Sequence, residues 1–173
     1  MNRMLSFAIL FATTLLLQIY LFNNLSISIY FSPLIYMALL LLLPVDTPHA
    51  GLLAAGLATG LIMDAAMGTG GLNTLAIMPL AFLRPWIIGL FYNREEEHDS
   101  SIPSTERFGP HKFLRYLICC VLLHHLLFFT FEALSWGYVW HTLLRIAISG
   151  AASVGFLWLI ARLFTFKIPV HLP

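Results

Sequence analysis

The stretch Gly60–Asn73, GLIMDAAMGTGGLN, places one carboxylate, Asp64, between two apolar segments and follows it with a cluster of glycines. In the run upstream of it the one charged residue is Asp46. Apolar blocks of this kind are typical of membrane spans, and glycine clusters mark the turns between them. Asp64 is therefore a candidate for a binding site, a helix cap or a turn residue.

The composition is that of an integral membrane protein. Of the 173 residues, 60% are hydrophobic and 10% are charged, whereas soluble domains carry roughly 25% charged residues. We expect an all-α integral membrane protein whose residues 1–173 form a single transmembrane domain. The net charge of +1 says little about partners. The adjacent Cys119 and Cys120 lie in an apolar run and indicate neither a disulfide framework nor a metal site.

The apolar blocks predict about six transmembrane helices, with five as the alternative. About 20 apolar residues are needed for a helix to cross the hydrocarbon core, and the second and third blocks are short. The expected spans are about 4–22, 33–43, 49–63, 73–92, 113–131 and 141–164, and a polar cytoplasmic loop is expected at 93–110. Residues 25–31 alternate apolar and polar letters, which is typical of a strand-like or interfacial segment.

The distribution of Lys and Arg predicts the orientation in the membrane. With a cytoplasmic N-terminus, the outer loops around 23–32, 64–72 and 132–140 hold neither residue type. Cytoplasmic loops carry the excess of Lys and Arg in membrane proteins, so both termini are expected in the cytoplasm. The inner cations are then Arg3, Arg94, Arg107, Lys112, Arg115, Arg162 and Lys167.

The spans contain no recognisable catalytic arrangement. They lack a pair of acidic residues, a Gly-x-Ser-x-Gly and a His-Glu-x-x-His, which hydrolase and protease mechanisms use. His124 and His125 point about 100° apart on a helix, which favours hydrogen bonding between helices over a shared metal. The glycine cluster lacks the Lys-Ser/Thr of a phosphate loop. We expect no enzyme activity, no catalytic residue, no metal and no cofactor.

Small residues on two spans are candidates for helix contacts. Gly56 and Gly60 on the third span, and Ser149 and Ser153 on the sixth, have spacings that bring small residues onto one helix face. Such faces let helices approach closely. The two alternatives are packing inside the bundle and an interface for a partner helix.

Ionisable residues within spans are expensive and are candidates for function. Arg84 lies mid-span between Pro79 and Pro85. It is expected to reach the inner interface or to bind a carbonyl group freed by Pro85. Glu132 and Arg145 lie toward the outer ends of the fifth and sixth spans, where they are expected to form an ion pair.

Residues 33–85 also resemble a known family. A proline-opened span and a Leu-rich run that ends in Pro44 and Pro48 precede a set of motif residues, which are Gly56, Gly60, Asp64, Gly68, Gly70, Gly71, Asn73, Arg84 and Pro85. This order resembles the rod shape-determining protein MreD family, over about a third of the chain. In the C-terminal half of the chain the resemblance rests only on the pattern of spans.

The resemblance implies a non-enzymatic inner-membrane scaffold of the bacterial cell-elongation machinery. The implied fold resembles the six-helix substrate-binding subunit of energy-coupling factor transporters. The implied partner is MreC, a bitopic protein with a periplasmic domain, alongside the actin-like MreB, the glycosyltransferase RodA and a transpeptidase. Together these direct peptidoglycan synthesis and rod shape. The lipid bilayer is the other partner, and no nucleic acid is expected.

The likeness to transporters supplies an alternative function, a small-molecule (vitamin) binding subunit. That function requires an outward pocket with convergent polar or aromatic groups. Trp136, Tyr138, Trp140 and His141 lie near the outer face and are candidates for it. The competing interpretation is an aromatic belt at the membrane interface.

For Asp64 these arguments favour architecture over catalysis. We expect it to end the third span at the outer interface, where it stays hydrated. It is also expected to cap the fourth helix by accepting hydrogen bonds from amides near Asn73, while the glycines provide the backbone angles of the turn.

Overall fold

The computed structural model describes residues 3–25, 28–91, 102–133 and 139–167, and the regular structure of these residues is entirely helical. Five helical stretches are long and apolar enough to cross a membrane, which makes this a multi-pass membrane protein. The elements are α1 (Arg3–Leu16) with the π-helical turn η1 (Leu17–Leu21) and the 3-10 turn η2 (Phe22–Asn24), α2 (Ala38–Leu42), α3 (His49–Met67), α4 (Leu72–Phe91), α5 (Thr105–Phe108), α6 (Pro110–Ala133) and α7 (Val139–Lys167).

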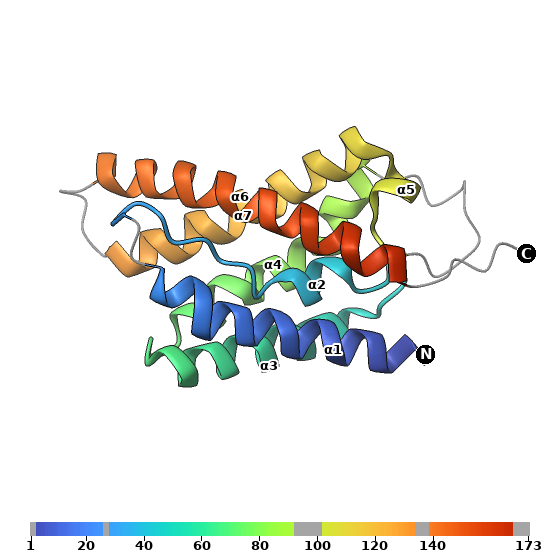
Figure 1. Cartoon of the computed structure of the whole chain (residues 1–173), viewed down its shortest axis with the longest axis horizontal. Coiled ribbons are helices and arrows are strands. Elements are labelled where there is room, and N and C mark those ends of the chain that lie inside the picture. The colour runs from blue at the N-terminus through green and yellow to red at the C-terminus, as the bar shows by residue number, and fades with distance from the viewer. Residues whose placement is uncertain (1–2, 26–27, 92–101, 134–138, 168–173) are drawn as a thin grey trace, which may run out of the picture.

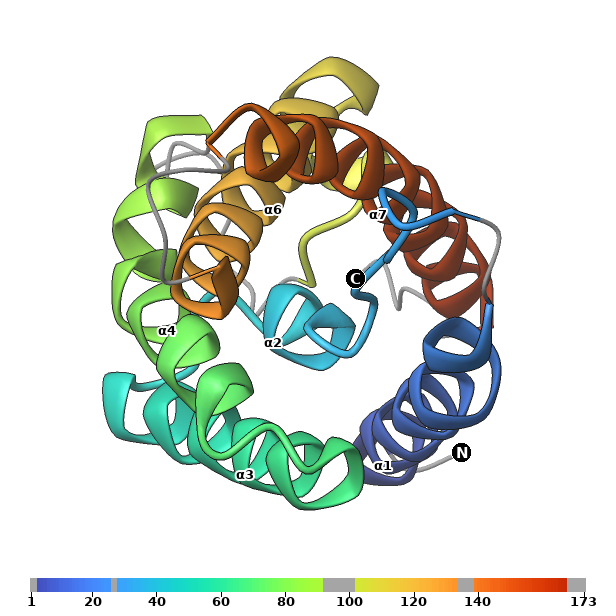
Figure 2. The same ribbon diagram turned by 90° about the vertical axis from the view of Figure 1, so that its left-hand side faces the viewer.

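The five long helices form a ring, and α2 with the chain that leads into it lies in the middle (Figure 2). Aromatic contacts join the first and last helices of the ring. Phe7 packs on Phe164 with ring centroids 5.3 Å apart, and Phe22 packs on Phe156 at 4.8 Å. These pairs show that α1 and α7 run antiparallel, so α1 begins and α7 ends at the same end of the bundle (Figure 1).

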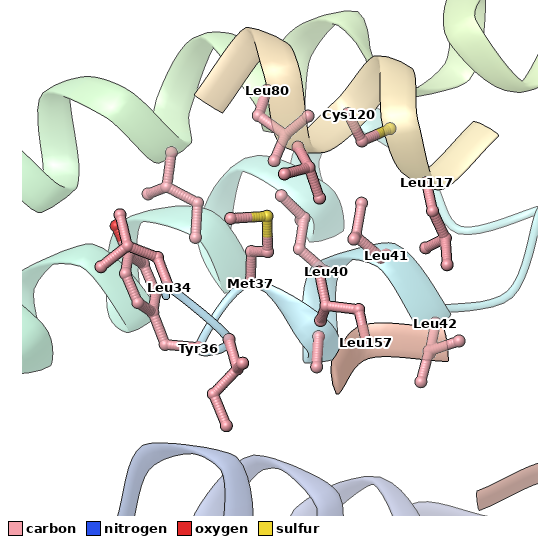
Figure 3. Packing of buried hydrophobic residues seen from close by; sticks show 14 of the residues in the cluster. Leu34, Tyr36, Met37, Leu40, Leu41, Leu42, Leu80, Leu117, Cys120 and Leu157 are labelled. Carbon is pink, nitrogen blue, oxygen red and sulfur yellow. The ribbon is translucent and has the colours of Figure 1, made fainter. Parts of the chain in front are cut away.

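The chain between α1 and α3 crosses the interior of the ring. We call residues 28–43 the inner segment; it is extended except for turns and the short helix α2. Apart from Leu39, every residue from Leu34 to Leu42 is at most 2% exposed. Figure 3 shows these side chains packed against Leu80, Leu117, Cys120 and Leu157 of the surrounding helices. The inner segment is therefore the core of the bundle.

The predicted span at 33–43 is wrong as a spanning helix. Only Ala38–Leu42 is helical, which is about 7.5 Å of helix. The chain still passes from one end of the bundle to the other here (Figure 1), so the expected six passages consist of five helices and one mostly non-helical segment. The other five spans lie within a few residues of the predicted ranges.

Two segments between the long helices, residues 25–31 and 93–110, also differ from expectation. The described residues of the strand-like stretch form a turn, in which the Phe31 amide donates to the Ser28 carbonyl at 3.0 Å. Of the expected polar loop at 93–110, residues 93–101 lie outside the described residues. The remainder packs against one end of the bundle, where Ile102, Ser104 and Phe108 are buried.

Helices α3 and α4 pack closely through the two glycines of α3. A Cβ atom added at Gly60 would lie 2.6 Å from the Cα atom of Thr74, and one added at Gly56 would lie 2.9 Å from the Cβ atom of Ala81. Both glycines are buried. Gly60 is the tighter position, because its neighbour is backbone that cannot rotate away. This small-residue face therefore serves packing inside the bundle.

Replacing Gly60 with Ala tests this contact. We expect Gly60→Ala to lower the free energy of unfolding by about 1–3 kcal/mol, because the methyl group forces α3 away from α4. The measurement is thermal and denaturant unfolding of the purified protein in mild detergent.

The matched control is Gly155→Ala on α7. A Cβ atom there meets nothing within 4 Å, and Ala favours helix over Gly by about 1 kcal/mol, so this variant should be as stable as the parent or more stable. Equal stability of the two variants would contradict the close approach of α3 and α4.

Candidate functional site

The carboxylate of Asp64 holds the corner between α3 and α4. Its Oδ1 atom accepts hydrogen bonds from the Asn73 amide at 2.8 Å and from the Thr69 hydroxyl at 2.6 Å. Its Oδ2 atom accepts from the Thr74 amide at 2.9 Å and from the Thr74 hydroxyl at 2.6 Å. The first amides of α4 thus point at a negative charge, which is the favourable arrangement at the start of a helix.

The turn that carries α3 into α4 depends on backbone angles that side chains rarely adopt. Gly68, directly after the last residue of α3, has φ of +65°, and Gly71, directly before α4, has φ of +104°. Glycine adopts both without a steric penalty. The Thr69 amide donates to the backbone carbonyl of Asp64 at 3.2 Å, so the turn folds back onto the residue whose side chain caps the next helix.

This geometry confirms the predicted cap and corrects the expected hydration of Asp64. The side chain is only 8% exposed. A carboxylate offers about four lone-pair sites, and with a fifth bond, from the Asn73 side-chain amide at 3.1 Å, donors of the chain itself surround the Asp64 carboxylate. Thr69 and Thr74 were missed in the sequence, although hydroxyl residues beside a helix start are the signal for capping.

Removing the carboxylate should loosen the corner. We expect Asp64→Ala to cost about 3 kcal/mol of unfolding free energy, because it leaves several buried donors unpaired. Thermal unfolding in detergent measures the loss. Asp46→Ala is the control, since Asp46 is exposed and surface substitutions usually change stability by less than about 0.5 kcal/mol. Similar stability of both variants would contradict a capping role.

The extended part of the inner segment takes its hydrogen bonds from side chains on the ring. Gln18, in the π-helical turn of α1, donates through Nε2 to the Pro33 carbonyl at 3.1 Å and accepts from the Ile35 amide at 2.6 Å. A π-helical turn is rare and often marks a functional position. Here that turn carries the Gln18 side chain that pairs with two backbone groups of the inner segment.

Two serines of α7 complete this pairing from the opposite side. The Ser149 hydroxyl accepts from the Ser32 amide at 2.9 Å and donates to the Tyr30 carbonyl at 2.8 Å. The Ser153 hydroxyl accepts from the Leu34 amide at 2.8 Å. Neither serine is exposed to any measurable extent. They bind the inner segment, and no surface remains through which they could contact another chain.

Of the two alternatives left open for these small residues, packing inside the bundle is the one that the structure shows at all four positions. Gly56 and Gly60 face α4, and Ser149 and Ser153 face the inner segment. The spacing of small residues identified close contacts correctly. It could not show whether the neighbour belongs to the same chain, and here it does.

The two adjacent histidines contact different parts of the interior. His125 lies 3.0 Å from the Val121 carbonyl through Nδ1 and 3.0 Å from the Ser153 hydroxyl through Nε2. Donation from Nδ1 to the carbonyl leaves Nε2 to accept the Ser153 proton. His124 bonds the Tyr36 hydroxyl at 2.7 Å. The prediction of hydrogen bonding between helices is confirmed for His125, which bonds from α6 to α7, whereas His124 bonds to the non-helical part of the inner segment.

Arg84 binds the other end of the inner segment. It is completely buried and donates to the carbonyls of Leu41 at 3.3 Å, Leu43, and Pro44 at 3.5 Å. Its Nε donates to the Tyr116 hydroxyl at 3.2 Å, and that hydroxyl donates to Leu41 at 3.0 Å. These carbonyls end α2, where a helix leaves acceptors unpaired and carries partial negative charge.

For Arg84 the expectation is half right. The guanidinium does bind carbonyl groups, but they belong to the inner segment and not to the helix that Pro85 interrupts. The side chain is buried within the bundle and does not reach its surface. Pro79 and Pro85 both lie inside α4, which continues through them.

The predicted ion pair between Glu132 and Arg145 is confirmed. The two side chains are 2.6 Å apart, and each is about one third exposed. The Arg145 guanidinium also lies over the Phe129 ring, 4.6 Å from its centroid. Exposed pairs contribute little to stability, so the pair serves mainly to join the last turn of α6 to the first turns of α7.

The residues considered for an outer pocket do not converge where they are described. Trp140 is 79% exposed, which is typical of an interfacial aromatic residue. His141 bonds the Tyr30 hydroxyl at 2.7 Å. Trp136 and Tyr138 lie outside the described residues. Among the described residues, no group of three or more His, Cys, Asp or Glu side chains could hold a metal ion.

Comparison of the chain with protein-family models, curated proteins and solved structures finds no match in any of the three. The roles of these residues are therefore inferred from their contacts within the chain.

Ser153 provides a test of the inner segment. We expect Ser153→Ala to cost roughly 1–3 kcal/mol, since the Leu34 amide and His125 lose a buried partner. Hydrogen–deuterium exchange should rise in the peptide that contains Leu34. Thr165→Ala is the control, because among the described residues the Thr165 hydroxyl bonds only carbonyls of its own helix. Unchanged exchange at Leu34 in the Ser153 variant would contradict the assigned contact.

Proposed function

We propose that this protein is a non-enzymatic scaffold of the MreD type, located in a bacterial inner membrane with both termini in the cytoplasm. In this role it binds the membrane helix of MreC. It acts with MreB, RodA and the elongation transpeptidase to direct peptidoglycan synthesis and maintain rod shape.

The proposal rests on the contacts made by the motif residues that resemble the MreD family. Asp64 and Asn73 lock the corner between α3 and α4, Gly60 brings these helices together, and Arg84 binds the inner segment. The polar side chains of Asp64 and Arg84 bond to groups inside the chain. A framework of this kind supports a protein that presents a fixed outer surface to other membrane proteins, and it leaves none of these groups for a reaction.

The filled centre of the ring favours the scaffold over the vitamin-binding alternative. Small-molecule sites are concave and enclose most of the ligand. In this bundle the corresponding space is occupied by the inner segment, whose residues from Leu34 to Ala38 are at most 2% exposed.

The cytoplasmic position of the termini is supported by where the described cations lie. Lys112, Arg115 and Arg162 are exposed near the start of α6 and the end of α7, at the end of the bundle where α1 begins (Figure 1). Loops rich in Lys and Arg remain in the cytoplasm.

The deciding experiment is a mild-detergent pull-down of the tagged protein from a rod-shaped bacterium that expresses it, with mass spectrometry of proteins and small molecules. We expect recovery of a single-span protein with a periplasmic coiled coil. Depletion of the protein should give rounded cells, measured as a fall in the ratio of length to width.

Two variants sharpen this test. Asp46→Ala should recover the partner at the parental level, whereas Asp64→Ala, which loosens the framework, should recover less. Recovery of a pair of ATPases, or of a stoichiometric vitamin, would overturn the scaffold and support a transporter subunit.

A further inference from the structure

A short segment between α4 and α6 folds back onto one end of the bundle. We call residues 102–108 the strap; its first three residues are buried, and so is Phe108 at its end. Figure 1 places α5, the helical part of the strap, at the end of the bundle where α1 begins. Thr105, Glu106 and Arg107 between them are half-buried or exposed. The strap therefore has one face on the bundle and another directed away from it.

Local hydrogen bonds and one glycine fix the shape of the strap. The Ser104 hydroxyl accepts from the Arg107 amide at 3.4 Å, and the Ser104 carbonyl accepts from the Phe108 amide at 3.0 Å. Gly109, directly before α6, has φ of +74°, a backbone angle that glycine adopts without a steric penalty. The turn at Gly109 thus joins the strap to α6 and directs Phe108 back onto the first turns of that helix.

The strap contacts the bundle at the ring of Tyr116 on α6. The Phe108 ring meets the Tyr116 ring edge to face, with centroids 6.0 Å apart and planes at 67°. The Phe113 ring lies against the same tyrosine at 6.3 Å, and all three rings are buried. Because Phe113 belongs to the same helix as Tyr116, the strap supplies an aromatic contact from outside that helix.

The Tyr116 hydroxyl bonds two groups at the end of the inner segment. It accepts from Arg84 Nε at 3.2 Å and donates to the Leu41 carbonyl at 3.0 Å. Arg84 in turn donates to the carbonyls of Leu43 and Pro44. Hydrogen bonds depend steeply on distance and direction, so a shift of the Tyr116 ring weakens both of its bonds at once. Direct contacts therefore lead from the strap to the end of α2.

We propose that the strap is a conformational control element for the inner segment. When docked, it fixes the position of Tyr116 and with it the bonds that Tyr116 and Arg84 make to the inner segment; any change that lifts it loosens that end of the segment. Packed side chains and hydrogen bonds carry coupling of this kind, and the coupling is reciprocal. The proposal does not depend on the scaffold function, because every contact that it uses lies within the chain.

Hydrogen–deuterium exchange of the full chain in mild detergent tests the coupling. The amides to follow are those of Leu41 and Leu43, which bond within α2 and at its end. We expect Phe108→Ala to raise their exchange rate by about tenfold, because the ring contact that positions Tyr116 is lost and local opening becomes easier. The Leu34 amide, which Ser153 binds, should change by less than about twofold.

The matched control is Glu106→Ala, since Glu106 is exposed on the same strap and its replacement should leave exchange at all three amides unchanged. Phe108→Leu keeps an apolar side chain in place, and it takes over the comparison if size-exclusion profiles show that Phe108→Ala misfolds. Unchanged exchange at Leu41 and Leu43 in the Phe108 variant would overturn the proposal.

A double-mutant cycle separates control through Tyr116 from simple covering of the bundle end. Tyr116→Phe keeps the ring and removes the hydroxyl that reaches Leu41. Adding Phe108→Ala to this variant should raise exchange at Leu41 by less than about a further twofold, because the two changes break the same connection. A further rise of about tenfold would mean that the two residues act independently, and it would also overturn the proposal.

Discussion

The structure depends on the need to pair backbone polar groups where no water can reach them. Spanning helices meet this need internally, whereas non-helical chain at membrane depth is tolerated only when protein surrounds and pairs it. The inner segment is such a chain, and several buried polar side chains of the surrounding helices bind its backbone. Gln18, Ser149 and Ser153 pair its extended half, and Arg84 pairs the carbonyls at its other end. These buried polar side chains therefore bind the backbone of their own chain.

Contacts between residues that lie close together along the chain could be predicted from the sequence, and contacts between distant residues could not. The cap of α4 joins Asp64 to groups at most ten residues away, and the ion pair joins residues thirteen apart. Both connect neighbouring spans whose relative positions follow from a single turn. The bonds of Ser149 and Ser153 reach 117 and 119 residues back. No local pattern predicts such a pairing, because it depends on how the ring closes.

The inner segment also shows why hydropathy misjudged one span. A run such as residues 33–43 is equally apolar whether its side chains contact lipid or other protein side chains. Its length, about half of what a membrane crossing requires, was the signal that distinguished the two. The buried residues Ile102 and Phe108 show the opposite case, since polar neighbours in the sequence concealed a segment that packs on the bundle.

The position of the inner segment has a consequence for biosynthesis. The ribosome makes residues 28–43 early, but the side chains that pair them, on Arg84, Tyr116, Ser149 and Ser153, are made later, and some only with the last helix. Until α7 is inserted, this stretch has no complete set of partners in the lipid. A product that stops before α7 would leave the backbone amides of Ser32 and Leu34 without their partners.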